Sequence, residues 1–145
     1  MIQRILHLLL LAVILGFLFP DSATTQSGDT GASKTPTGKI ILVQAMMCED
    51  MLELVPRNPT TVFSIERRKA ICFTSFDPVT EKTIVYHQWF HRDQNSAKIK
   101  LTLKPPRWST YSSIQFRAED IGPWRVEITD SKGHIFQILR FSITE

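Results

Sequence analysis

Two cysteines, Cys48 and Cys72, carry the most distinctive chemistry in this 145-residue sequence. They are too far apart to form a CxxC redox motif. In an exported domain such a pair predicts a disulfide, and closing a loop of about 25 residues would stabilise the fold by about 3.5 kcal/mol. Two buried free thiols are the main alternative, and a redox or metal role is a third.

Two histidines, His87 and His91, lie four residues apart in the stretch TIVYHQWFH. If this stretch is a strand, their Cα atoms are about 13 Å apart, whereas a ligand bond to zinc is about 2 Å long. The pair therefore cannot share one ion, and we predict no metal site and no cofactor. His87 falls on the same face as Val85 and Trp89, so we predict a hydrogen-bonded core histidine, with a place in a ligand pocket as the alternative.

A serine hydrolase would need a nucleophile and its partners, and Ser112, Ser113, His87 and Asp130 are of the right types. The sequence lacks the nucleophile-elbow pattern, and serines on strands commonly bond to their neighbours. Glycine-rich phosphate loops are absent, and the paired carboxylates fall in predicted turns. We therefore predict no catalytic residue and a protein that is not an enzyme, with a hydrolase as a minor alternative.

Basic residues next to exposed aromatic side chains are the best candidates for a binding surface. The predicted binding residues are Arg92, Lys98, Lys100, Lys104, Arg107, Tyr111 and His87. The net charge of +3 is too small to predict a nucleic-acid partner, but it permits contact with anionic envelope polymers or lipid head groups. The alternative is that these lysines protect an edge strand from aggregation.

The stretch Thr83 to His91 must be a central strand, because both of its faces are largely apolar. Further strands are predicted at residues 39–47, 69–76, 98–103, 107–116, 124–129 and 135–143, with a short edge strand at 62–64. Pro56 and Pro59 predict an irregular connection between residues 48 and 59. About seven strands separated by turn signals predict an all-β, immunoglobulin-like antiparallel β-sandwich, with a closed barrel as the alternative.

The front of the chain has a different composition. Residues 1–23 predict a signal peptide or an N-terminal anchor, because Arg4 precedes an apolar run over residues 5–19 that is shorter than the roughly 20 residues of a membrane span. Residues 24–38 are polar and predict a disordered linker. Residues 39–145 are then the β-sandwich domain. We expect an exported protein, either periplasmic or anchored through residues 5–19 to the inner membrane and facing the periplasm.

Several short motifs follow one another in a recognisable order. They are CFTSF at residues 72–76, HQWF at 87–90, RWSTYSS at 107–113 and GPWRVEITD at 122–130. In order and spacing they resemble the bacterial family called domain of unknown function 2914. The resemblance implies an exported or membrane-tethered envelope domain with a β-sandwich fold and no established activity, so no catalytic residue carries over. We therefore expect a binding or assembly module of the bacterial envelope with a protein partner, or alternatively one that recognises carbohydrate or another anionic polymer.

Overall fold

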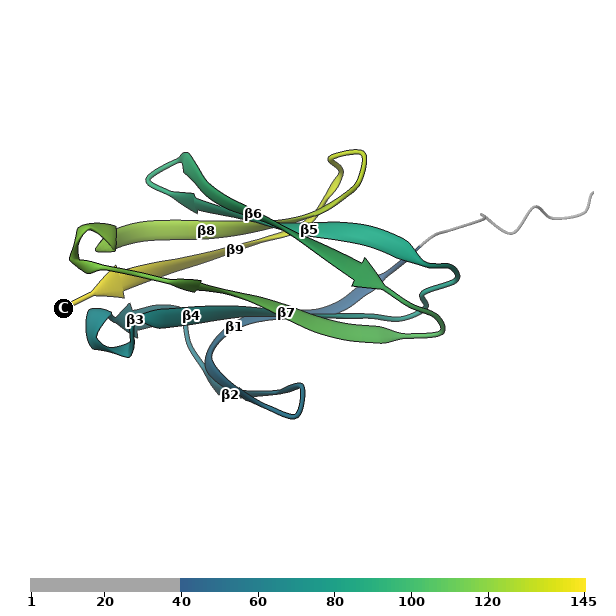
Figure 1. Cartoon of the computed structure of the whole chain (residues 1–145), viewed down its shortest axis with the longest axis horizontal. Coiled ribbons are helices and arrows are strands. Elements are labelled where there is room, and N and C mark those ends of the chain that lie inside the picture. The colour runs from purple at the N-terminus through teal and green to yellow at the C-terminus, as the bar shows by residue number, and fades with distance from the viewer. Residues whose placement is uncertain (1–39) are drawn as a thin grey trace, which may run out of the picture. The chain divides into compact units, whose positions relative to one another are not determined.

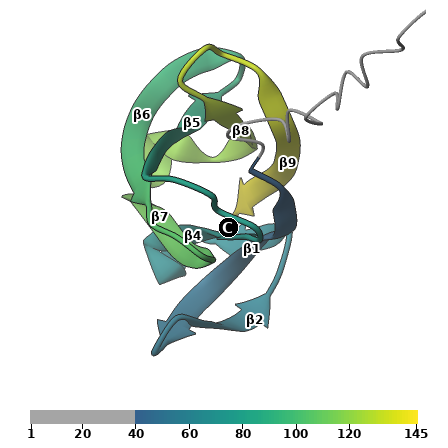
Figure 2. The same ribbon diagram turned by 90° about the vertical axis from the view of Figure 1, so that its right-hand side faces the viewer.

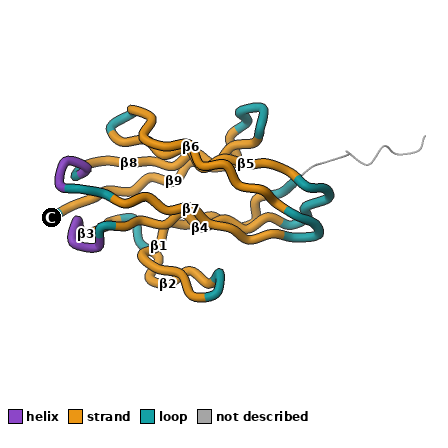
Figure 3. The backbone as a smooth tube through the Cα atoms, in the orientation of Figure 1, coloured by secondary structure: helices purple, strands orange, loops and turns teal. Residues whose placement is uncertain are grey.

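The computed structural model describes residues 40–145, which form an all-β domain (Figures 1 and 3). Its strands are β1 (Leu42–Leu52), β2 (Val55–Pro59), β3 (Val62–Ser64), β4 (Lys69–Phe76), β5 (Thr83–His91), β6 (Gln94–Leu103), β7 (Trp108–Gln115), β8 (Gly122–Asp130) and β9 (Ile135–Thr144). Two 3-10 turns, η1 (Ile65–Arg67) and η2 (Ala118–Asp120), complete the described range. The predicted signal or anchor (1–23) and linker (24–38) lie outside it. None of the described helices has the length and apolar character needed to cross a membrane.

Two sheets lie face to face, as the end-on view in Figure 2 shows. One has the strand order β2-β1-β4-β7, and the other has the order β3-β9-β8-β5-β6. Every strand pair is antiparallel except β3 with β9, which is parallel. The predicted all-β architecture of two packed sheets is confirmed, and both sheets contribute side chains to one core.

Strand β5 lies between β8 and β6, as its two apolar faces predict. Its inner residues Val85, His87 and Trp89 are fully buried between the sheets. Its outer residues Tyr86 and Phe90 are only partly covered. The central strand therefore has one face in the core and one half-covered face toward solvent.

The predicted irregular connection over residues 48–59 is wrong. Strand β1 continues to Leu52, and β2 pairs back onto it to form a hairpin that extends away from the two sheets (Figure 1). Pro56 and Pro59 lie in β2, which pairs only with β1. Because β2 is an edge strand, its outward-facing backbone needs no N–H donors, and prolines are tolerated there.

The predicted disulfide is not formed in the structure, where Cys48 and Cys72 are free, buried thiols. Cys48 lies opposite Ile71, and Cys72 lies opposite Met47, in the pairing of β1 with β4. Residues directly opposite share a face of the sheet, and successive residues alternate between faces. The two thiols therefore point to opposite faces of one sheet. Burial raises the pKa of both thiols, most strongly that of Cys72.

Candidate functional site

His87 is the centre of a buried polar cluster that joins the two sheets. Its Nε2 lies 3.1 Å from Thr74 Oγ1, and its Nδ1 lies 2.8 Å from Ser112 Oγ. The indole N–H of Trp89 also donates to Ser112 Oγ, at 3.1 Å. Thr74 and Ser112 belong to β4 and β7, whereas His87 and Trp89 belong to β5 in the opposite sheet. His87 is therefore a satisfied core histidine and lines no described pocket.

Burial lowers the pKa of His87 to about 4, so its imidazole is neutral at pH 7. The imidazole contacts Ser112, but Asp130 lies elsewhere and bonds to His134 Nδ1 at 2.8 Å. Burial alone would raise the pKa of Asp130, but hydrogen bonds from His134 and from the backbone of Lys132 outweigh it and lower that pKa. The imagined Ser112, His87 and Asp130 triad is therefore not assembled.

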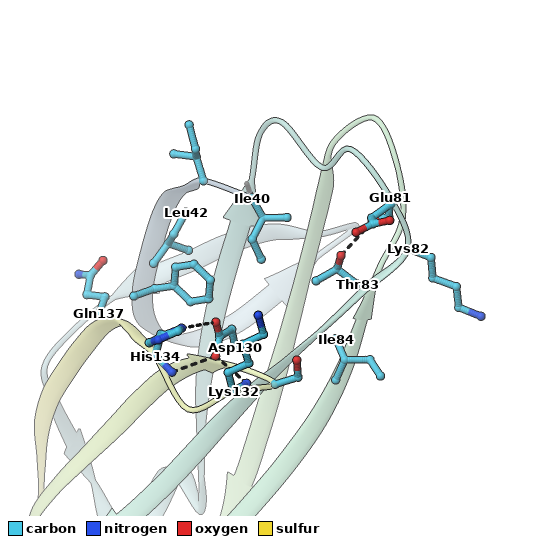
Figure 4. Close-up of a pocket in the computed structure, with 13 residues that line it drawn as sticks. Ile40, Leu42, Glu81, Lys82, Thr83, Ile84, Asp130, Lys132, His134 and Gln137 are labelled. Atoms are coloured by element: carbon cyan, nitrogen blue, oxygen red, sulfur yellow. Dashed lines mark hydrogen bonds and ion pairs between the residues drawn. The ribbon is translucent and has the colours of Figure 1, made fainter. Parts of the chain in front are cut away.

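A wide groove of about 850 Å³ lies where the start of β1, the start of β5 and the β8–β9 turn meet (Figure 4). Ile40, Leu42 and Phe136 supply its apolar part, and the paired Asp130 and His134 stand at the turn. None of the predicted binding residues lines it. Across residues 40–145, no three His, Cys, Asp or Glu side chains are grouped so that they could hold a metal ion.

The predicted basic and aromatic set is spread over several parts of the domain. Lys98 and Lys100 lie on β6, an edge strand, and belong to the outer face of the five-stranded sheet. Lys104 and Arg107 flank the β6–β7 connection, and Tyr111 lies on β7 in the other sheet. Arg92 occupies the β5–β6 turn, and His87 is buried. Lys98 and Lys100 thus lie together on one face of a sheet, whereas the other members of the set lie elsewhere.

The outer face of the five-stranded sheet combines aromatic rings with cations. Its residues of this kind are Tyr86, Phe90, Lys98, Lys100, Arg125 and Arg140. Lys98 Nζ lies 4.4 Å from the centroid of the Tyr86 ring, and the Arg125 guanidinium lies 4.1 Å from that of Phe90. Both distances are within the range of cation–π attraction.

Arg125 and Arg140 were missed by the sequence analysis. They come from β8 and β9, and the register places them directly opposite each other. The available signal was their position, because the two strands predicted at residues 124–129 and 135–143 follow one another along the chain. The two arginines were not compared across these strands.

The tip of the β1–β2 hairpin, residues 52–55, is a second exposed feature that the sequence analysis missed. Leu52, Leu54 and Val55 are 54%, 49% and 54% exposed. Glu53 and Leu54 form the two-residue turn and have φ angles of 47° and 65°. A leucine in this left-handed region is strained, because its Cβ crowds the following carbonyl. The tip therefore holds apolar side chains in solvent on a strained turn.

Comparison with known proteins tests the resemblance seen in the motifs. Residues 82–143 match the family described as "Protein of unknown function (DUF2914)". The match runs from the residue before β5 into β9, so it includes the outer face and leaves out the β1–β2 hairpin. No curated protein matches the chain. Over residues 82–143, therefore, the chain is similar to the DUF2914 family that its motifs predicted.

Proposed function

We propose that this protein is an exported, non-enzymatic binding or assembly module of the bacterial cell envelope, which docks onto a protein partner through the tip of its β1–β2 hairpin. The observation that carries the proposal is the exposure of Leu52, Leu54 and Val55 on a hairpin that projects from the domain. Adjacent exposed apolar side chains are typical of protein interaction sites.

The strain in the turn supports the same role. A two-residue turn of this kind is most stable with Asn-Gly, yet the chain has Glu53 and Leu54 there. Positive φ angles at such residues cost about 1 to 3 kcal/mol and are frequent at functional sites. A stable fold does not require a leucine at position 54. An apolar contact with a partner would require an apolar side chain there.

The charges around the tip indicate which kind of partner surface would fit it. Glu49 and Asp50 precede the tip and are held by Arg67 and Lys69, at 3.3 Å and 3.5 Å. Within the described range Glu53 has no cation at ion-pair distance. At residues 52–55 the tip carries three apolar side chains and the single charge of Glu53, which favours a protein surface with an apolar pocket and a basic group beside it.

The strand order supports the finer assignment of an immunoglobulin-like sandwich. Strands β1, β4 and β7 occupy the places of strands A, B and E, and β5, β8 and β9 occupy those of C, F and G. Trp89 on β5 corresponds to the buried tryptophan of strand C in immunoglobulin domains. Such sandwiches commonly serve as binding modules, although fold alone assigns no partner.

The composition of the chain before the domain supports the proposed compartment. The apolar run over residues 5–19 is typical of an export signal or anchor, and residues 24–38 are typical of a flexible linker. We infer that the domain works in the periplasm, either free or held at the inner membrane.

A capture experiment tests the docking proposal. Wild-type protein, the triple variant Leu52→Ser, Leu54→Ser, Val55→Ser and the control Ile135→Ser are immobilised and exposed to solubilised envelope proteins. Ile135 is also about half exposed but lies on β9. Burial of each half-exposed side chain contributes about 1 kcal/mol, so the triple variant should bind about 100-fold more weakly. A partner retained equally by all three proteins would contradict the proposal.

The outer face of the five-stranded sheet favours a second candidate function, recognition of an anionic envelope polymer. Lys98 stacks on the half-buried ring of Tyr86, and Lys100 lies opposite Tyr86 on β6. Changing Lys98 and Lys100 to Glu should abolish salt-sensitive binding to polygalacturonate or lipopolysaccharide. Arg107→Glu is the matched control, because Arg107 lies on the β6–β7 connection. If the double variant binds both polymers as well as the wild type, this candidate fails.

A further inference from the structure

A small hollow of about 130 Å³ lies at one end of the outer face, where the β5–β6 turn meets β8 and β9. Its lining consists of Phe90, Arg92, Asp93, Pro123, Trp124, Arg125 and Arg140. Three guanidinium groups therefore border it, against the single carboxylate of Asp93. The local charge is positive, and the size suits one small charged group rather than a whole ligand molecule.

Arg125 is fixed in place before any ligand arrives. Its Nε–H donates to Glu127 at 2.8 Å, its Nη1 contacts Asp93, and its guanidinium packs on the Phe90 ring. Hydrogen bonding to Glu127 raises the pKa of Arg125, so its charge is permanent. A guanidinium has more N–H donors than these two acceptors use. The N–H groups on Nη2 remain for a ligand.

Arg92 is positioned by the backbone beside it. Its Nη2 donates to the carbonyl oxygen of Ile121 at 2.9 Å. A Cβ atom at Gly122 would lie 3.2 Å from Arg92 Nε, and Gly122 has a φ of 130°. Glycine at this position therefore permits both the backbone conformation and the close approach of the arginine.

Arg140 lies directly opposite Arg125 in the β8–β9 pairing. Among residues 40–145, no carboxylate lies within ion-pair distance of Arg92 or Arg140. Asp93 and Glu127 already offset the charge of Arg125, so the charges of Arg92 and Arg140 are the ones that an anion would pair with.

We propose that Arg92, Arg125 and Arg140 form a binding site for one oxyanion, a carboxylate or phosphate group carried by an anionic polymer that lies along the outer face. Planar guanidiniums match the geometry of both groups and bind them through paired charge-assisted hydrogen bonds. This proposal rests on the second candidate function and names the group that the face recognises.

The test uses two small probes of known chemistry, tetragalacturonate as the carboxylate source and inorganic pyrophosphate as the phosphate source. Each is titrated into the wild type, Arg140→Gln and the control Lys132→Gln, and binding is followed by amide chemical shifts. We expect wild-type shifts around the hollow, an affinity at least about 10-fold lower in Arg140→Gln, and no change in Lys132→Gln. The probe that binds more tightly identifies the source of the oxyanion.

A second measurement needs no ligand. Arg140 makes no ion pair in the described range, so Arg140→Gln should leave the Tm without ligand within about 2 °C of the wild type while its affinity falls. The proposal is overturned if neither probe shifts resonances at the hollow, or if Arg140→Gln and wild type bind both probes equally. Probes that bind at the hollow while no polymer binds the face would keep this site and reject the polymer function. Polymer binding that depends on Lys98 and Lys100 but not on Arg140 would keep the polymer function and reject this oxyanion site.

Discussion

The β1–β2 and β5–β6 hairpins have the same kind of turn, but the side chains of the two turns make different contacts. Each turn has two residues, neither of them glycine, and both have positive φ: 47° and 65° at Glu53 and Leu54, and 45° and 67° at Arg92 and Asp93. In the β5–β6 turn, Arg92 bonds to the Ile121 carbonyl and Asp93 pairs with Arg125. In the β1–β2 turn, Leu54 points its side chain toward solvent.

The difference shows where strain is compensated within the domain and where it is not. Hydrogen bonds from Arg92 to the carbonyl oxygens of Ile121 and Pro123, and the ion pair of Asp93 with Arg125, hold the β5–β6 turn. The fully buried His87 and Trp89 lie on β5 of the same hairpin. The β1–β2 hairpin begins at the buried Cys48 and ends in an uncompensated tip. We infer that contact with a partner offsets the backbone strain at this tip. The predictions below test this contrast.

The largest effect should come from the base of the β5–β6 hairpin. His87→Leu leaves the Thr74 and Ser112 hydroxyls without their imidazole partner in the core, which should lower the free energy of unfolding by about 4 kcal/mol. Cys48→Ala, at the base of the other hairpin, should lower it by about 1–2 kcal/mol. Urea denaturation of both variants measures the difference. A smaller loss in the free energy of unfolding for His87→Leu than for Cys48→Ala would contradict the expected difference between the two hairpins.

Stability should also depend on pH through His87. Its pKa falls from an ordinary value of 6.5 to about 4 on folding, so the unfolded chain binds the proton more readily. The contribution of the neutral imidazole is complete above pH 6.5 and declines as the pH falls toward 4, by up to about 3 kcal/mol. Denaturation at pH 7.5, 5.5 and 4.5 should show the decline in the wild type and a flatter profile in His87→Leu. Parallel profiles would show that another group is responsible.

Exchanging the turn residues compares the two tips directly. Glu53→Asn with Leu54→Gly places the preferred residues in the β1–β2 turn and should raise the free energy of unfolding by about 1–2 kcal/mol. Arg92→Asn with Asp93→Gly relieves similar strain but removes the contacts to Ile121 and Arg125, so its net effect should be close to zero. Thermal unfolding measures both. Equal stabilisation by the two exchanges would show that the tips do not differ.

The smallest effect concerns the thiols. Both cysteines are buried and free, and burial raises the pKa of both, so the folded protein should react with a thiol reagent only slowly at pH 8. Cys48, at the base of the β1–β2 hairpin, should react before Cys72, which lies in the core between the sheets. Denaturation without reductant should expose two reactive thiols. Finding none would show that the pair is oxidised.

The strands of the core were predictable because their residues alternate between the core and the outside. The alternation of Val85, His87 and Trp89 was enough to predict the inner face of β5, and His87 was correctly predicted to be a bonded core histidine. What the sequence could not show was register. Cys48 lies opposite Ile71 and not opposite Cys72. This difference of one residue in the pairing of β1 with β4 places the two thiols on opposite faces of the sheet.

The candidate sites were predicted less well, for two physical reasons. Pro56 and Pro59 indicated an irregular segment, but prolines also occur on edge strands, and only the pairing with β1 shows that β2 is one. The basic residues were grouped by closeness in sequence, whereas Arg125 and Arg140 meet across a hairpin. Lys98 and Lys100 share the outer face because they alternate with inward-facing Ile99 and Leu101.

Site-specific photo-cross-linking in cells that make the protein tests the central claim, that the β1–β2 tip docks onto a protein. A photoreactive amino acid replaces Leu54 in one strain and the exposed Asn95 of the β5–β6 hairpin in another, and adducts of the full chain are resolved by mass. We predict a discrete protein adduct from position 54 that is absent from position 95 and is lost when Leu52 and Val55 are changed to Ser. No adduct from position 54, or the same adducts from both positions, would contradict the account.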